Sequence, residues 1–222
     1  MLHDALLIAG KDLRIEGRAR VTTTQVAPFA GVVLVLFAVA FDADQEVLRR
    51  LAAGLFWVAV LFATVLAASR SAAIEREDGA RDSLLLSGLD PAGIFIGKAT
   101  AIAAQLLALE SLLLAGVIVL FDVAVHDSAL LIVSAVVATL GIASLATLYG
   151  VLASSTRNAD TLLPLLFLPA AAPVLVCAAR AWETALDTSP GGGWGGMTFL
   201  GVFAIVYMAA GILAFGPLLE ES

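Results

Sequence analysis

The chain has 222 residues and a formal net charge of −7, with 61% apolar residues, 14% charged residues and a mean hydropathy of +1.01. Soluble domains are about 45–50% apolar and about 25% charged, so this composition excludes a water-soluble domain and indicates an all-α, polytopic membrane protein. The single cysteine, Cys177, excludes an internal disulfide and a cysteine-based metal cage, and the lack of a basic patch excludes a nucleic-acid partner.

The first segment, residues 1–20, is predicted to form an amphipathic helix that lies along the membrane interface. Leu2, Leu6, Ala9 and Leu13 recur at helical spacing, and charged residues occupy most of the remaining positions. Two interpretations stay open for this helix: it frames the site of a partner protein, or it is a simple membrane anchor.

Six long apolar segments follow within a single transmembrane permease domain, residues 1–222. About 20 apolar residues are needed to cross a hydrocarbon core of about 30 Å, so each segment is predicted to be a transmembrane helix. The predicted spans are Thr23–Phe41, Leu51–Ser69, Ala99–Phe121, Ala129–Leu152, Leu162–Ala179 and Met197–Leu219.

The basic residues predict that both termini lie in the cytoplasm. By the positive-inside rule, the side richer in Lys and Arg is cytoplasmic. That side holds nine basic residues, and the other side holds Arg49, Arg50 and Arg180. The nine are Lys11, Arg14, Arg18, Arg20, Arg70, Arg76, Arg81, Lys98 and Arg157.

The cytoplasmic segment between the second and third spans, residues 70–98, is predicted to be a coupling loop. Asp90 followed by Pro91 indicates that the third helix begins near Pro91, with the aspartate as its N-cap. Upstream, Asp78-Gly79 indicates a turn, followed by a short helical segment at residues 80–87.

Three adjacent leucines in that short segment need a cover on the water side of the membrane. Either the membrane surface or the groove of a soluble partner provides it. We expect the second arrangement, with an ATPase docked on a surface formed by Asp78, Gly79, Arg81, Asp82, Leu84, Leu85, Leu86 and Leu89.

Glu110 is the ionisable residue in the middle of a predicted span. Such residues are costly in hydrocarbon and face a bundle interior or a wet cavity, so Glu110 is a candidate functional residue. Gln105 and Ser111 are predicted to be its polar neighbours. An interhelical hydrogen bond donated by a protonated Glu110 is an equally good interpretation.

No motif indicates an enzyme. The segment from Gly93 to Thr100 resembles a phosphate-binding loop but has three residues between its glycines and Ala99 after Lys98, so the chain is not expected to bind ATP. Gly93 and Gly97 are instead predicted to form a close helix-packing surface. No catalytic residues and no metal ligands are predicted.

The fifth span contains three prolines, each of which removes a backbone donor. This helix is therefore predicted to be kinked or broken. The bend marks either a gate or a purely structural kink. The residues concerned are Pro164, Pro169 and Pro173.

The predicted topology matches that of an ABC exporter permease, and several short segments stand in a recognisable order: Gly54-Leu-Phe-Trp57-Val-Ala59, Asp78-Gly79, Leu84-Leu85-Leu86, Lys98 and Leu168-Pro169-Ala-Ala-Ala-Pro173. Over essentially the whole chain, the sequence resembles the CcmB family, the permease-like subunits of the cytochrome c maturation (haem exporter) system. It departs from the family at Ala80-Arg81-Asp82, where Ser/Thr-Leu-Glu is common.

The resemblance implies a subunit of the cytoplasmic (inner) membrane that couples a separate ATPase to haem transfer or to release of a haem-loaded chaperone. The implied partners are a CcmA-like ATPase, which binds ATP and Mg²⁺, CcmC-like and CcmD-like membrane subunits, and a CcmE-like haem chaperone. Haem is then handled by the complex, with no cofactor bound by this chain. A homodimer is expected, because ABC exporters need two permease halves.

Two other functions stay open. The chain could be an ABC exporter permease for a lipid, a polysaccharide or a drug. It could also be a non-conducting scaffold that transmits ATPase motion to a haem-handling partner.

Overall fold

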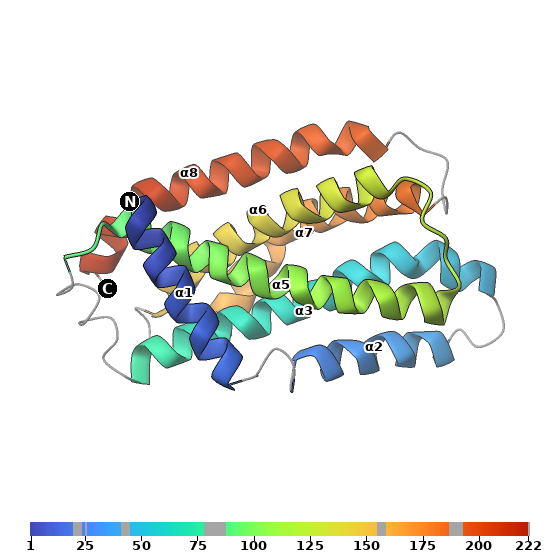
Figure 1. Cartoon of the computed structure of the whole chain (residues 1–222), viewed down its shortest axis with the longest axis horizontal. Coiled ribbons are helices and arrows are strands. Elements are labelled where there is room, and N and C mark those ends of the chain that lie inside the picture. Colours follow the sequence, from blue (N-terminus) through green and yellow to red (C-terminus); the bar gives the residue numbers. More distant parts are fainter. Residues whose placement is uncertain are drawn as a thin grey trace.

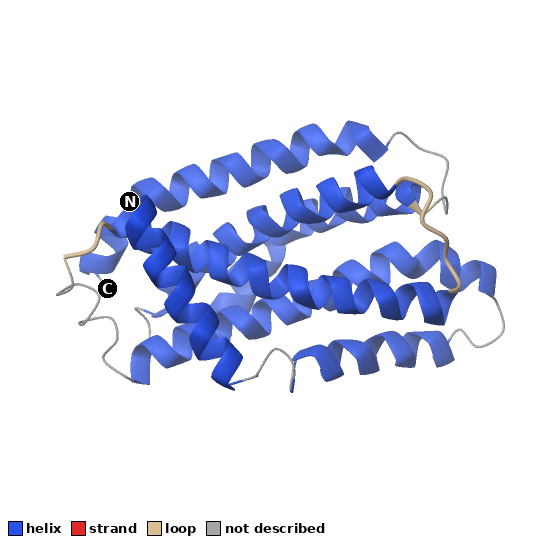
Figure 2. Cartoon of the chain, in the orientation of Figure 1, coloured by secondary structure: helices blue, strands red, loops and turns tan. Residues whose placement is uncertain are grey.

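The computed structural model describes residues 1–19, 24, 26–40, 45–77, 88–154, 159–186 and 193–221, and within these ranges every regular element is a helix (Figure 2). The elements are α1 (Leu2–Ala19), α2 (Ala27–Ala40), α3 (Gln45–Glu77), α5 (Pro91–Phe121), α6 (Ser128–Ser154), α7 (Ala159–Ala185), the short 3-10 helix η2 (Gly193–Gly196) and α8 (Met197–Glu221).

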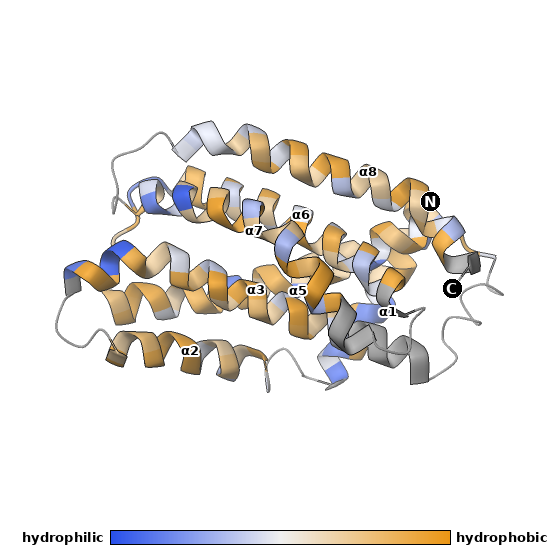
Figure 3. Cartoon of the chain, turned by 180° about the vertical axis from the view of Figure 1, so that it is seen from behind, coloured by the Kyte–Doolittle hydropathy of each residue, from blue (hydrophilic) through white to orange (hydrophobic). Residues whose placement is uncertain are grey.

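The long helices form an elongated bundle with both chain ends at the same end, here called the termini end (Figure 1). Helix α6 lies at its centre and contacts α3, α5, α7 and α8, whereas α2 packs on α3 and α5 at one side. Apolar residues dominate the middle of the long helices, and hydrophilic residues gather at α1 and at the end opposite the termini (Figure 3). This distribution fits a bundle whose middle lies in hydrocarbon.

Among the described residues, five helices are long and apolar enough to cross a membrane: α3, α5, α6, α7 and α8 with η2. Helix α2, the counterpart of the first predicted span, has 14 residues. It begins at Ala27 rather than at Thr23, which places Pro28 in the first turn, where a proline is tolerated. At about 1.5 Å per residue, α2 is shorter than the hydrocarbon core, so the first predicted span, Thr23–Phe41, stays a prediction.

Helices occupy much of the segment predicted to be a coupling loop, residues 70–98, and residues 78–87 of that segment lie outside the described residues. Helix α3 continues to Glu77, and no Gly or Pro interrupts the sequence before Gly79. The predicted start of α5 is confirmed: the Ala92 N–H donates to Asp90 Oδ1 at 3.1 Å, and Pro91 is the first helical residue.

Helix α1 crosses the first turns of α5 at the termini end (Figure 1). A Cβ atom at Gly97 would lie 2.7 Å from the Ala5 carbonyl oxygen and 2.7 Å from Ile8 Cβ, and one at Gly93 would lie 2.9 Å from Asp4 Cβ. The predicted packing surface of the two glycines is thus confirmed, and α1 is the helix that uses it.

The fifth span was predicted to be kinked or broken, and its counterpart, helix α7, is not broken. It runs as one helix from Ala159 to Ala185 through all three prolines. The rings of Pro169 and Pro173 lie on the exposed face, and Pro164 is half-buried. The rings of Pro169 and Pro173 therefore do not have to fit between packed helices.

Candidate functional site

Glu110 of α5 lies inside the bundle, with 3% of its surface exposed. The Thr139 hydroxyl of α6 donates a hydrogen bond of 2.6 Å to Glu110 Oε1. The other oxygen, Oε2, is also buried and has no partner among the described residues. A carboxyl group in such surroundings is expected to be protonated, because the ionised form is costly in an apolar interior.

The polar neighbours predicted for Glu110 are not its partners. Ser111 is exposed and donates to the Leu107 carbonyl of its own helix at 2.8 Å, and Gln105 is half-buried one turn away. Thr139 was missed because it stands 29 residues further along the chain. A threonine in an apolar span usually bonds its own helix backbone, so the sequence carried no signal for this pair.

A cluster of three aromatic side chains, Phe56, Trp57 and Trp182, joins α3 to α7. The rings of Phe56 and Trp182 are stacked with centroids 4.0 Å apart, and Trp57 meets both rings edge to face. All three side chains are buried. The indole nitrogens of Trp57 and Trp182 have no hydrogen-bond partner among the described residues, so the cluster holds two unused donors.

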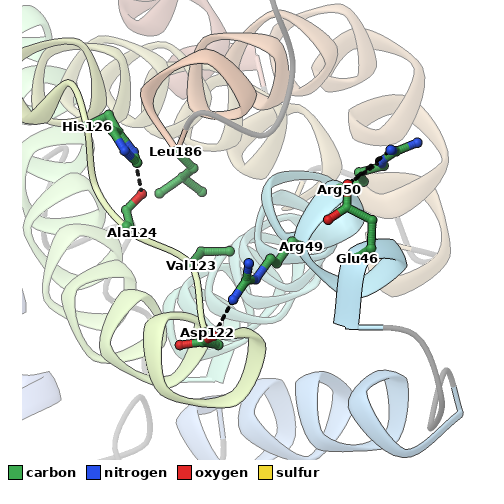
Figure 4. A pocket seen from close by; sticks show the side chains of 8 residues that line it. All are labelled: Glu46, Arg49, Arg50, Asp122, Val123, Ala124, His126 and Leu186. Atoms are coloured by element: carbon green, nitrogen blue, oxygen red, sulfur yellow. Dashed lines mark hydrogen bonds and ion pairs between the residues drawn. The ribbon is translucent and has the colours of Figure 1, made fainter.

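A pocket of about 390 Å³ opens at the end opposite the termini (Figure 4). We call it the Arg49 pocket. Helix α3 supplies its basic side chains, and the α5–α6 connection and the end of α7 supply the other walls. The lining residues are Glu46, Arg49, Arg50, Asp122, Val123, Ala124, His126 and Leu186.

Two ion pairs cross or border the Arg49 pocket (Figure 4). Arg49 pairs with Asp122, the C-cap of α5, and the Arg49 Nε atom is buried without a partner among the described residues. Arg50 pairs with Glu46 of the same helix at 3.0 Å. The side chains of both pairs are 42–77% exposed, so each pair stabilises the fold only weakly.

The connection between α5 and α6 is ordered by hydrogen bonds to neighbouring elements. The backbone N–H groups of His126 and Asp127 both donate to the Ala185 carbonyl at 2.9 and 3.1 Å. Asp127 also accepts from the Leu130 N–H at 2.9 Å and from the Trp194 indole at 3.3 Å. No local sequence pattern predicts that Arg49 lies beside this connection, because Arg49 and Asp122 stand 73 residues apart in the chain.

The predicted ATPase-docking surface lies almost entirely outside the described residues. Only Leu89 is described: it is half-buried and packs against a small cluster that includes Phe95 and Phe215. The residues outside the description are Asp78, Gly79, Arg81, Asp82, Leu84, Leu85 and Leu86.

Within the described ranges, no group of three or more His, Cys, Asp or Glu side chains could hold a metal ion. The structure brings together two groups of candidate site residues. Glu110 and Thr139 meet inside the bundle. At the end opposite the termini, the Arg49 pocket brings together Arg49, Arg50, Asp122 and His126.

Comparison with known proteins gives two consistent matches. The sequence model of the family described as CcmB protein matches residues 3–222. The chain is also 26% identical over 190 residues to a protein named Heme exporter protein B from Pseudomonas aeruginosa, and the match covers 84% of each chain.

Proposed function

The chain belongs to the CcmB protein family, and from this premise we propose that it is the permease-like membrane subunit of a haem exporter used in the maturation of c-type cytochromes. The family match over residues 3–222 carries the proposal. The name of the relative, Heme exporter protein B, and the five apolar helices support it. Deleting the gene should abolish c-type cytochromes and leave b-type cytochromes intact, and normal c-type cytochromes in the deletion strain would contradict the proposal.

In this proposal the energy comes from a separate CcmA-like ATPase, and the chain itself is not an enzyme. The ATPase docks on the segment that contains Leu84, Leu85 and Leu86. Replacing Leu85 and Leu86 by Asp should abolish co-purification of the ATPase without stopping membrane insertion, because charged side chains would not enter an apolar groove. Undiminished co-purification of the double variant would contradict this docking site.

The proposed assembly lies in the cytoplasmic membrane, with the termini end in the cytoplasm and α1 along the interface. It includes CcmC-like and CcmD-like subunits and works with a CcmE-like haem chaperone. A second copy of the chain supplies the other permease half, since most homo-oligomers close with two-fold symmetry. Native mass spectrometry from mild detergent should count two copies for each pair of ATPase subunits, and a count of one would contradict the dimer.

We propose that Glu110 contributes to transport as an uncharged hydrogen-bonding group of the bundle interior. Glu110→Gln keeps an acceptor for the Thr139 hydroxyl, whereas Glu110→Leu removes it. The Gln variant should support c-type cytochrome maturation and the Leu variant should not. Normal maturation with both variants would remove Glu110 from the mechanism.

A further inference from the structure

We propose that the Arg49 pocket is a binding site for the acidic group of an amphipathic acid. The inference goes beyond the proposed function, because the same acid chemistry is found in a porphyrin carboxylate and in the headgroup of an anionic lipid. It rests on the size of the pocket and on its unused cationic donor.

The size of the pocket suits part of a small ligand. Its volume of about 390 Å³ falls within the range of about 300–1,000 Å³ that is typical of ligand pockets. Three separate segments line it, and the hydrogen bonds of His126 and Asp127 to the Ala185 carbonyl tie two of them together. The site is therefore formed before a ligand arrives.

The guanidinium group of Arg49 is the main acid-binding group. It uses one terminal nitrogen for Asp122, while its Nε–H is buried and has no acceptor among the described residues. A buried donor without an acceptor is costly, and a bidentate arginine–acid pair is among the strongest hydrogen-bonded contacts in proteins. A ligand acid that replaces Asp122 could satisfy both nitrogens at once.

The carboxylates in the pocket do not preclude an anionic ligand. The Asp122 side chain is 77% exposed and the Glu46 side chain is 62% exposed, so both can turn into water at little cost. Arg50 then becomes a second cation next to Arg49. His126 also lines this pocket, where its ring contacts the Ala124 carbonyl at 3.3 Å.

The walls below the rim are apolar. Val123 is 6% exposed and Leu186 is 3% exposed, and both belong to the main core. The Leu186 N–H donates to the Trp182 carbonyl, so Leu186 lies one turn outward from the aromatic cluster. Because so little of either side chain is exposed, these two residues close the inner side of the pocket, and its polar rim is the part that can contact a ligand.

The test uses the full-length chain in nanodiscs of zwitterionic lipid. The probes are iron protoporphyrin IX, which has two carboxylates, its dimethyl ester, which has none, and phosphatidylglycerol, which replaces part of the zwitterionic lipid. Binding of the acid porphyrin should weaken at least tenfold in Arg49→Gln and Arg50→Gln. The matched control Arg180→Gln, an exposed arginine of α7 outside the pocket lining, should stay within twofold of the wild type.

Asp122→Asn separates loss of the site from loss of the fold. It removes the anion that competes for Arg49, and Asn accepts the left-handed backbone of this position (φ +49°). This variant should bind the acid porphyrin several-fold more tightly, which no unfolded variant would do. Binding of the dimethyl ester as tight as that of the acid, or equal acid binding by wild type and both arginine variants, would overturn the proposal.

The phosphatidylglycerol arm identifies the source of the acid. If the lipid is the natural occupant, it should displace the porphyrin from wild type but not alter the residual binding of Arg49→Gln. If it does not displace the porphyrin, the site is selective for the porphyrin acid. Either result supports an acid site, and the deletion experiment on c-type cytochromes tests the haem-export role separately.

Discussion

The two ends of α5 are held in different ways. At the termini end, Asp90 caps the helix and α1 lies directly on Gly93 and Gly97, with no room for a side chain between the backbones. At the other end, α5 stops at the left-handed residue Asp122, whose exposed carboxylate pairs with Arg49 beside an open pocket. Close backbone packing holds α5 at the termini end, whereas an exposed ion pair, whose partners can be exchanged, holds it at the opposite end.

This difference has a physical consequence. Water cannot replace a close backbone contact, so the α1–α5 junction should be rigid and intolerant of added volume. Water, or a ligand acid, can replace an exposed carboxylate at an arginine. The bundle therefore combines a fixed junction at the termini end with an end that can exchange its partners.

The largest effect is expected for Gly97→Ala, which adds one Cβ atom 2.7 Å from the Ala5 carbonyl oxygen. Overpacking should lower the free energy of unfolding by about 1–3 kcal/mol, although alanine is the better helix former. The matched control is Gly116→Ala on the same helix, where nothing lies within 4 Å of the added atom.

Unfolding by SDS in mixed micelles measures both glycine variants. Gly116→Ala should be neutral or stabilising by up to about 1 kcal/mol. Equal stability changes for the two variants would show that α1 does not press on α5 as described.

A smaller effect is expected for Asp90→Ala, which removes the side-chain acceptor of the Ala92 N–H. Loss of an N-cap lowers the free energy of unfolding by about 0.5–2 kcal/mol, and the same SDS titration measures it. Asp90→Asn is the control, because it keeps an acceptor oxygen and should retain most of the stability. An alanine variant as stable as wild type would argue against the cap.

The smallest effect on stability is expected at the opposite end of α5. A double-mutant cycle with Arg49→Gln and Asp122→Asn should give a coupling energy of about 0.2–1 kcal/mol, which is typical of exposed ion pairs, and it should fall as salt is added. A coupling energy as large as the loss of unfolding free energy in Gly97→Ala would mean that the ion pair holds its end of α5 as firmly as packing holds the other end. The proposed difference between the two ends would then be wrong.

Much of the architecture follows from composition and local pattern. The apolar segments from residue 51 onward all became long helices, because an apolar run of this length satisfies its own backbone only as a helix in lipid. Asp90 and Pro91 predicted the start of α5 because an N-cap and a first-turn proline act within a single turn. The glycine pair, Gly93 and Gly97, predicted a close contact without naming the partner helix.

The tertiary structure decided what depends on distant segments. It brought Glu110 to Thr139 and packed α1 against Gly93 and Gly97. It also placed Arg49 beside Asp122 and Leu186, where these residues line a pocket. No local pattern contains this information, since apolar helix faces of similar composition can pack in many registers and only the fit of whole helices selects one. The sequence by itself thus determined the helices and their polarity, whereas packing decided which side chains meet.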